Sequence, residues 1–498
     1  MKKVLIALAF AGALLCGASC DRLNTETKEE DEQSLQYKFV NTFLYNSMST
    51  YYLWVDDSSV ASRMSEWKLN AEPIETVSYV KHEDDRWTQA TDDYDSFISS
   101  TSGVSTTYGY DLSLYWGDSS KSYVVAVITL VYPDSPAIEA GLARGDVITQ
   151  VNGKTMTADD YVSIVNDEMF NSASVVLTRS DGSELTLVSR QMYEDPVICS
   201  KILDIGGRKY AYLFYNSFTL KSIPDLVKLS SQYASEGVYG LILDLRYNGG
   251  GYVDTEVVLG SLCAPADVVK AETVFHTTKY NNLLADAWGE GAEPFCKEYK
   301  SSDGTVYDVL GANMGIKKMY AIVTSSSASA SEGLLVGLLP YMDITIVGEQ
   351  THGKYCTGIM MSANSWFSET MDADNWSDAS KYQSFKESFS EYKKYVDDWG
   401  LYVMIGRFAD KNGETPCMPA GFTPDVAAAD DPVERFEFGS SEESMLAVVT
   451  SLIEGDTSTA TKSQTTAVLP LTPYQHRPAN FGLFVGREGD EQRYIYNR

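Results

Sequence analysis

Histidine is scarce in this sequence and cysteines are not paired, and both features restrict the chemistry that the chain can carry. Only four histidines occur in 498 residues, and they form no HExxH motif and no other ligand cluster. Five of the seven cysteines lie after residue 20, without the short paired spacing of a zinc site or a redox motif. We therefore expect no metal and no other cofactor. One or two disulfides are possible, but the spacing assigns no cysteine pair.

Positive charge is also in short supply. The chain has 39 Lys and Arg against 69 Asp and Glu, a net charge of −30. Removal of residues 1–19 would delete Lys2 and Lys3 and no acid, so the charge would become −30 − 2 = −32. Such a chain repels nucleic acid and anionic lipid. We expect no nucleic-acid partner, and we interpret the acidity as a solvated surface.

Long hydrophobic runs are absent except at the N-terminus. A basic start, MKK, precedes an apolar run over residues 4–18, which is too short to cross a bilayer and typical of a secretory signal. The run ends in GASC and resembles a lipobox, although Gly17 stands where leucine is usual. The resemblance implies cleavage after residue 19 and a lipid on Cys20, and ordinary signal cleavage is the alternative. We expect an exported lipoprotein of a Gram-negative-type envelope, at the periplasmic or cell-surface face of the outer membrane.

The remainder has the composition of a folded chain, with 44% hydrophobic residues and length for two or three domains. Residues 20–33 are polar and predict a tether. Residues 34–105 predict a helical region, because apolar residues recur at helical spacing after Ser34, which we expect as an N-cap.

Residues 106–190 resemble a PDZ domain of the bacterial, permuted kind. The resemblance rests on SPAIEAGLARGDVITQVNG at residues 135–153, with YGYDLSL upstream. It implies that a peptide end is received near Gly109, Tyr110 and Leu112, as an added strand whose carboxylate is held by backbone N–H groups. A domain used only for packing or regulation is the alternative.

Residues 195–430 alternate strands with helices. YGLILDL, KMYAIVT and DITIVG are short apolar runs, as expected for strands covered on both faces. An insertion over residues 362–402 carries one apolar helix stripe, formed by Tyr382, Phe385, Phe389, Tyr392 and Val396. We expect this stripe to pack on the domain, and a lid is the alternative. Residues 431–498 predict a C-terminal helix and tail.

The stretch TSSSASASEGLL, residues 324–335, poses the central question. A strand, a tight turn and a helix would place one serine at a helix N-terminus, where negative charge is favoured and a nucleophile gains. The alternative is a capping box, S-x-x-E, from Ser329 to Glu332. A nucleophile needs a base, and His352 and Lys354 follow the next strand. Lysine can serve if burial lowers its pKa from about 10.4 to near 7.

SSASASEG followed by TIVGEQTHGK resembles the catalytic core of the C-terminal processing peptidases, or tail-specific proteases. In that family the middle serine of SASASE is the nucleophile and a lysine lies 25 residues later; here 354 − 329 = 25, which implies Ser329 and Lys354. LILDLRYNGGG resembles the family's D-L-R-x-N-x-G-G and implies an oxyanion site made by the N–H groups of Gly250 and Ala330. The implied fold is multidomain α/β, with a helical N-terminal region, a PDZ domain and a ClpP/crotonase-like catalytic domain.

Two positions leave the orientation of the lysine open. Bacterial members often have glutamine four residues after the lysine, and here that residue is Gly358. A plant branch uses a glutamate three residues after the serine, and Glu332 is available, so we include Glu332 among the predicted catalytic residues.

The predicted function is a secreted serine-type endopeptidase that cleaves extended or unfolded polypeptides through an acyl-enzyme, with selection by their C-termini at the PDZ domain as one option. Residues 348–355, GEQTHGKY, approach a phosphate-binding loop, but Tyr355 replaces its Ser or Thr. The main alternative is an inactive or gated peptide-binding lipoprotein, against which the joint presence of Ser329, Lys354 and Gly250 argues. Oligomeric state is left open.

Overall fold

The computed structural model describes residues 32–101, 103–289, 291–455 and 469–470. The predicted signal peptide, Cys20, most of the tether and most of the tail lie outside the described residues. No helix in the described ranges is both long and apolar enough to cross a bilayer.

Helices dominate the N-terminal region, as predicted. They are α1 (Glu32–Tyr51), α2 (Ser58–Ser65), α3 (Pro73–Val80) and α4 (Tyr94–Thr101). Helix α1 begins at Glu32, so the prediction of Ser34 as its N-cap is wrong, and Ser34 lies in the first turn. The short strand β1 (Gln89–Thr91) pairs with β20 (Gly400–Ala409) of the following region, so the N-terminal region is built into the larger fold.

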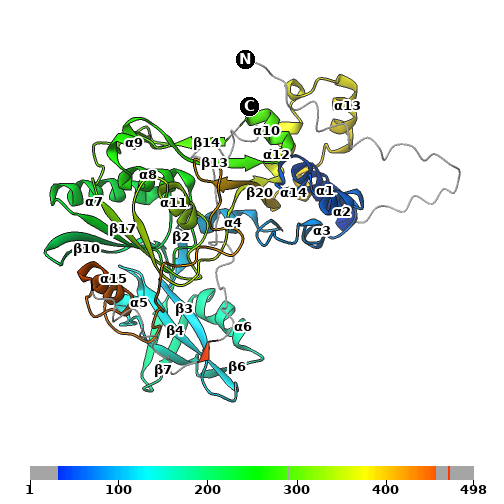
Figure 1. Ribbon diagram of the computed structural model, residues 1–498. Coiled ribbons are helices and arrows are strands. Elements are labelled where there is room, and N and C mark those ends of the chain that lie inside the picture. Colours follow the sequence, from blue (N-terminus) through cyan, green and yellow to red (C-terminus); the bar gives the residue numbers. More distant parts are fainter. Residues whose placement is uncertain (1–31, 102, 290, 456–468, 471–498) are drawn as a thin grey trace.

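The PDZ-like region forms a separate lobe, drawn in cyan in Figure 1. Its sheet contains β3 (Tyr110–Trp116), β4 (Tyr123–Val131), β5 (Val147–Val151), β6 (Lys154–Thr157), β7 (Ser174–Arg179) and β8 (Glu184–Val188). Its helices are α5 (Pro136–Glu139), capped by Ser135, α6 (Tyr161–Ser163) and η2 (Ile164–Phe170). The chain enters and leaves the lobe through the antiparallel pair β2 (Val104–Thr107) and β9 (Arg190–Tyr193).

A six-stranded sheet forms the centre of the largest lobe. Its order is β10 (Val197–Ile205), β11 (Arg208–Tyr215), β12 (Gly240–Asp244), β17 (Lys318–Val323), β18 (Ile344–Gly348) and β21 (Val426–Ala427). All neighbours are parallel except β10 and β11. The three apolar runs of the sequence are therefore adjacent buried parallel strands, as predicted.

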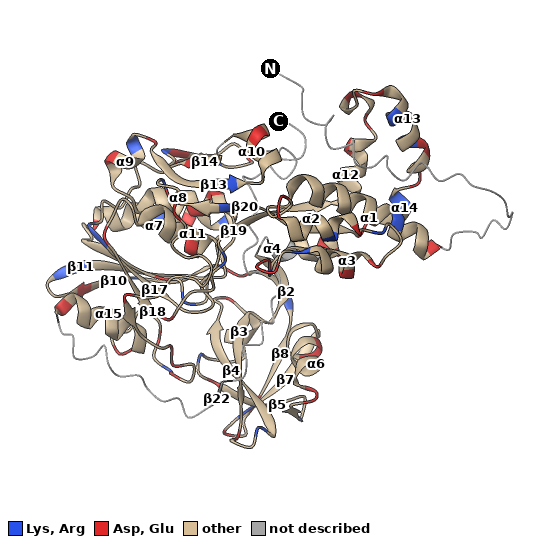
Figure 2. Ribbon diagram, turned by 45° about the vertical axis from the view of Figure 1, so that its right-hand side comes forward, with Lys and Arg blue, Asp and Glu red and all other residues tan. Residues whose placement is uncertain are grey.

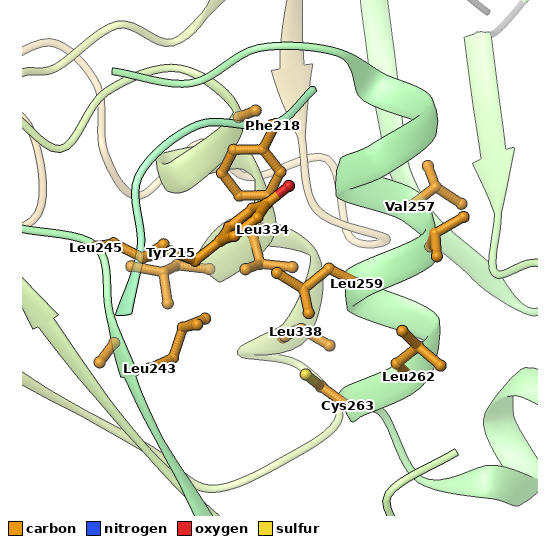
Figure 3. Close-up of a cluster of buried hydrophobic side chains, with 14 of the residues drawn as sticks. Tyr215, Phe218, Leu243, Leu245, Val257, Leu259, Leu262, Cys263, Leu334 and Leu338 are labelled. Carbon is orange, nitrogen blue, oxygen red and sulfur yellow. The ribbon is translucent and has the colours of Figure 1, made fainter. Parts of the chain in front are cut away.

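Helices cover both faces of this sheet. One face packs on α7 (Ile223–Ser235), α8 (Val253–Cys263) and α11 (Ala330–Leu338), and Figure 3 shows this core, with Leu243 of the sheet and Leu259 and Leu334 of the helices. The other face packs on α15 (Ser444–Glu454) and on Leu130 and Tyr132 of the PDZ-like lobe.

The chain that follows β18 leads into a second sheet. This sheet contains β1, β20, β13 (Val274–Tyr280), β14 (Gly291–Pro294) and β19 (Cys356–Ser362). The smaller remaining elements are η3 (Leu220–Ser222), α9 (Ala266–Lys270), α10 (Asn282–Trp288), β15 (Glu298–Lys300), β16 (Val306–Asp308), η4 (Ala373–Asn375) and β22 (Leu469–Pro470).

The predicted insertion is a helical connection between β19 and β20. It consists of α12 (Ala363–Thr370), the short η4, α13 (Ala379–Ser388) and α14 (Lys393–Val396). Since residues 400–402 already belong to β20, the helical part spans residues 363–399. The apolar stripe is divided between α13 and α14, so the single helix expected there is wrong. The stripe packs on the N-terminal region, and the Phe39 and Phe389 ring centroids are 5.1 Å apart.

Cysteine pairing and surface charge were both addressed by the sequence. All five described cysteines are free thiols, so none of the disulfides that the sequence left open is formed among them. Acidic positions are spread over all the lobes in Figure 2, which fits a solvated acidic surface.

Candidate active site

The serine-rich stretch is the turn between β17 and α11. Ser329 is the N-cap of α11 and has φ +57° and ψ −114°, a backbone conformation that is costly for a non-glycine residue. Its side chain is fully buried, and its Oγ has no hydrogen-bond partner within the described part of the chain. Neighbouring serines have structural partners: Ser327 Oγ donates to Leu245 O at 2.7 Å, and Ser331 Oγ donates to Asn248 O at 2.9 Å. Among the buried serines of the turn, Ser329 alone therefore has an uncommitted hydroxyl.

Glu332 does more than cap the helix. Its Oε2 accepts the Ser329 N–H at 3.2 Å, so the capping-box geometry considered from the sequence is present, although Ser329 Oγ makes no hydrogen bond in it. The same oxygen accepts the Lys354 N–H at 2.8 Å. Oε1 accepts the Gly353 N–H at 2.8 Å and the Thr351 hydroxyl at 2.5 Å. One carboxylate thus joins the serine turn to the lysine loop through their backbones.

Burial governs the charge of Glu332. Desolvation raises the pKa of this carboxyl, and its hydrogen bonds with Thr351, Gly353, Lys354 and Ser329 oppose that rise. Three of the four donors are backbone N–H groups, which favour the ionised form.

Lys354 lies at the end of the loop between β18 and β19, and its side chain is fully buried. Burial lowers the pKa of Lys354 to about 7, and the nearby carboxylates of Asp85 and Glu332 oppose this lowering. The amine Nζ donates a hydrogen bond to the Tyr402 hydroxyl at 3.1 Å. It also lies 5.1 Å from the ring centroid of Tyr402 and 5.7 Å from that of Trp87. The enclosure that the sequence analysis required of a lysine base is present.

The N-terminal region supplies part of this enclosure, which sequence reasoning missed. Trp87 is buried, and its segment is ordered by Asp85, whose Oδ1 accepts the N–H groups of Trp87 and Thr88, each at 2.9 Å. Asp85 Oδ2 in turn accepts the Tyr52 hydroxyl at 2.8 Å. No local motif marks these residues, because they reach the lysine only through the packing of the N-terminal region.

His352, the other base considered from the sequence, lies in the same loop. Burial and the nearby Arg86 lower the pKa of His352 to about 4, so the imidazole is neutral at neutral pH. Its backbone N–H donates to Ser327 O at 3.0 Å, which attaches the lysine loop to the serine turn at a second point.

The glycine loop lies against the serine turn. A Cβ at Gly250 would be 2.8 Å from Ser329 Cβ and 3.1 Å from Ala330 N, and Gly250 has φ +109°, so both space and backbone require glycine there. Ala330 is the first residue of α11, a position whose N–H has no acceptor within the helix.

The Gly250 N–H, the predicted oxyanion donor, is engaged in this conformation. It donates to Asn248 Oδ1 at 2.9 Å. Asn248 also donates through Nδ2 to Tyr215 O at 2.9 Å, and its backbone carbonyl accepts the Ala328 N–H at 3.1 Å. Asn248 therefore holds the glycine loop on the serine turn. Its side chain satisfies the N–H that an oxyanion would need.

Charged residues behind the loop connect it to the PDZ-like lobe. Arg246 is fully buried and pairs with Asp244 at 2.7 Å, Glu443 at 2.5 Å and Asp430 at 2.8 Å. Arg144 of the PDZ-like lobe pairs with the same Asp430 at 3.1 Å. The chain segment that bears the glycine loop therefore shares an ion-pair network with the lobe.

The residues expected to receive a peptide in the PDZ-like lobe are largely used within it. The Tyr110 ring is buried and its hydroxyl donates to Met169 O at 2.7 Å, while the Gly109 N–H donates to Thr107 Oγ1 at 3.0 Å. Both groups therefore have partners within the lobe in this conformation, and their part in peptide binding stays a prediction. Leu112 is half-buried in β3. The outer edge of β3 pairs with β22, Leu469 opposite Trp116 and Pro470 opposite Tyr115.

The phosphate-binding alternative does not fit the structure. Residues 348–355 lead from β18 into β19, which begins at Cys356, whereas a phosphate-binding loop leads into a helix.

The structure thus brings together a buried serine turn, an enclosed lysine and an attached PDZ-like lobe. Residues 209–428 match the model of peptidase family S41, and residues 127–168 match a PDZ domain. The resemblance to the C-terminal processing peptidases is thus confirmed as a match of residues 209–428 to peptidase family S41, and the fold class predicted from the sequence is confirmed.

Known relatives agree with this assignment. The C-terminal processing peptidase of Tetradesmus obliquus chloroplasts is 28% identical over 271 residues, covering 51% of this chain and 52% of the relative. The carboxy-terminal processing protease CtpA of Bacillus subtilis is 23% identical over 224 residues, covering 44% and 42%. The chain thus spans about half the length of the curated relatives it matches.

The fold has a solved counterpart. A crystal structure from Bacteroides fragilis NCTC 9343, assigned to the S41 proteases, superposes with a TM-score of 0.63 at 20% identity, covering 88% of this chain and 99% of that one. This likeness concerns the fold.

Proposed function

We propose that this chain is a serine-type endopeptidase of the C-terminal processing kind, which cleaves extended or unfolded polypeptides with Ser329 as nucleophile and Lys354 as base. The observation that carries the proposal is the pair of buried groups joined by Glu332: an uncommitted Ser329 hydroxyl and a Lys354 amine whose pKa is about 7. Roughly half of the lysine is neutral at pH 7, and a neutral amine accepts a proton.

The reaction proceeds in two transfers. Neutral Lys354 takes the proton of Ser329 Oγ, and Oγ bonds to the substrate carbonyl carbon. The tetrahedral intermediate collapses, the C–N bond breaks, and the leaving amine takes the proton from Lys354. Water, deprotonated by Lys354, then attacks the acyl carbon. The C–Oγ bond breaks, Ser329 Oγ takes the proton back from Lys354, and the acid is released. The Glu332 carboxylate holds the backbones of Ser329 and Lys354 in fixed relative positions during both transfers.

The oxyanion requires N–H donors at the nucleophile turn. The Ala330 N–H at the start of α11 is one. The Gly250 N–H is the second once it is released from Asn248 or shared with it, and the conformation described above is then a resting state. This engaged N–H is also the observation that favours the alternative of a gated or inactive peptide-binding protein.

The proposal extends to location and selection. The apolar run over residues 4–18 and Cys20 support an exported lipoprotein, anchored to the outer membrane by its N-terminal lipid. The PDZ domain at residues 127–168 supports selection of substrates through their C-termini. In this view the β3 edge next to Leu112 takes the peptide after the lobe rearranges.

The test measures cleavage of a reduced, unfolded protein by purified residues 21–498, and compares the wild type with the variants Ser329→Ala and Ser331→Ala. The wild type and Ser331→Ala should cleave, and Ser329→Ala should not, because only Ser329 provides the nucleophile. Absence of cleavage by the folded wild type, with binding of C-terminal peptides, would favour the gated or inactive reading. Equal cleavage by Ser329→Ala would refute the nucleophile.

A further inference from the structure

The buried amine of Lys354 needs a fixed orientation to act on a neighbouring hydroxyl. A neutral amine has a single lone pair, and the direction of that lone pair is set by the acceptors of its N–H groups. Glu332 holds the backbone of Lys354, which positions the start of the side chain. The group at its far end decides where the lone pair points.

We propose that Tyr402 is the positioning residue for the Lys354 amine, and that it occupies the space left by the glycine at position 358. This inference rests on the proposed function. It assigns to β20 a part of the site that no motif around Ser329 or Lys354 contains.

The contact itself is direct. Lys354 Nζ donates to the Tyr402 hydroxyl at 3.1 Å, and the Tyr402 side chain is 3% exposed. Because the ring centroid is 5.1 Å from Nζ, the same residue excludes water from the amine and supplies a hydrogen-bond acceptor to it. An acceptor for one N–H leaves the lone pair to face another direction.

The sheet register explains why glycine stands at position 358. On β19 and β20, Gly358 pairs with Met404 and Met360 pairs with Tyr402, so Gly358 and Tyr402 are diagonal neighbours on one face. A Cβ at Gly358 would meet the end of the Met404 side chain, which is flexible enough to move aside, and would lie 2.8 Å from both Cε2 and Cζ of Tyr402. These are atoms of a rigid ring, so any side chain at 358 would have to displace it. Gly358 is not in the positive-φ region, and the requirement is therefore for space.

Surrounding elements hold the tyrosine firmly. Tyr402 pairs with Gln89 of β1 on its other side, and its ring centroid lies 6.0 Å from that of Phe97 in α4. The N-terminal region thus supplies Trp87 and packs on Tyr402, the two aromatic residues that cover the lysine. An aromatic side chain held in this way loses little freedom when it binds the amine.

The first test is Tyr402→Phe, measured as kcat, KM and the pH dependence of kcat on a peptide substrate. The ring remains and so does the packing, while the acceptor is lost. We expect kcat to fall by about 10- to 100-fold with KM nearly unchanged. The midpoint of the rise of kcat with pH should move down, because the hydroxyl favours the charged amine.

A matched control is Tyr233→Phe in α7, which removes another buried tyrosine hydroxyl. This hydroxyl is hydrogen-bonded to Ser200 Oγ at 2.7 Å. This variant should keep the wild-type kcat and pH midpoint. If Tyr402→Phe is folded and also keeps both, the proposal is overturned. A wild type that cleaves nothing would instead overturn the proposed function, so the two failures are distinguishable.

The second test exchanges the occupants of the space. Gly358→Gln alone should lose activity through collision with the ring, and Tyr402→Ala alone should lose it through loss of the acceptor. The double variant Gly358→Gln, Tyr402→Ala should recover at least about tenfold over Tyr402→Ala, because the amide oxygen replaces the hydroxyl as acceptor. A folded double variant with no recovery would overturn the assignment of that space to Tyr402.

Discussion

Replacement of Lys354 by methionine should make the protein more stable while abolishing cleavage. Methionine has nearly the length of the lysine side chain and carries no charge, and its sulfur suits the aromatic rings of Tyr402 and Trp87 that line the site. The native lysine, by contrast, is fully buried, and burial lowers its pKa from 10.5 to about 7. That lowering is a cost to the folded state.

The cost follows from linkage between protonation and folding. The fall from 10.5 to about 7 corresponds to about 5 kcal/mol, at about 1.4 kcal/mol per pH unit. Between these two pH values the unfolded chain binds the proton and the folded chain does not, so stability rises with pH. The full cost applies below pH 7, and about 2 kcal/mol remains at pH 9.

Urea unfolding with linear extrapolation measures this difference. The free energy of unfolding of Lys354→Met should exceed that of the wild type by about 4 kcal/mol at pH 7, and this difference should shrink by roughly half at pH 9. Lys68→Met, at an exposed lysine, should change stability by less than about 0.5 kcal/mol at either pH. A Lys354→Met variant no more stable than the wild type, or an excess independent of pH, would refute the buried neutral lysine.

Four other perturbations of the same site have defined outcomes. Cleavage should fall as the pH drops through about 7, since protonated Lys354 accepts no proton; a rate unchanged from pH 9 to pH 5 would contradict a lysine base. Lys354→Arg should fold, by circular dichroism, yet be inactive, because guanidinium stays protonated. Trp87→Ala should admit water to the amine and move the midpoint of the pH–rate curve upward, and an unmoved midpoint would show that Trp87 does not desolvate it. Glu332→Ala should lower the unfolding free energy by about 3 kcal/mol and remove activity, since the backbone N–H groups of Ser329, Gly353 and Lys354 lose their acceptor; wild-type cleavage would show the carboxylate to be dispensable.

Local pattern in the sequence predicted much of the catalytic lobe. The three apolar runs became β12, β17 and β18, because short continuous apolar runs suit strands buried on both faces. The strand–turn–helix at Ser329 was also predictable, since its signals lie within a dozen residues. The same reasoning was wrong for the insertion stripe, where apolar spacing continued across the break between α13 and α14.

Orientation of hydrogen-bonding groups was less accessible to the sequence. The N–H of Gly250 points to Asn248 Oδ1, and the Tyr110 ring points into the PDZ core, although both residues occupy the motif positions expected of them. A motif specifies which residue is present, whereas the direction of its donors depends on the final backbone and on competing acceptors.

The sequence by itself determined which residues are the candidates for the reaction. Ser329 and Glu332 lie in one strand–turn–helix and Lys354 in the loop after the next strand, so their spacing is local information. Only the tertiary structure decided whether Lys354 can be neutral near pH 7. That property comes from burial, and Trp87 and Tyr402 reach Lys354 from the N-terminal region and from β20, segments far from it along the chain. Desolvation depends on everything that packs around an amine, so it cannot be read from the residues beside it.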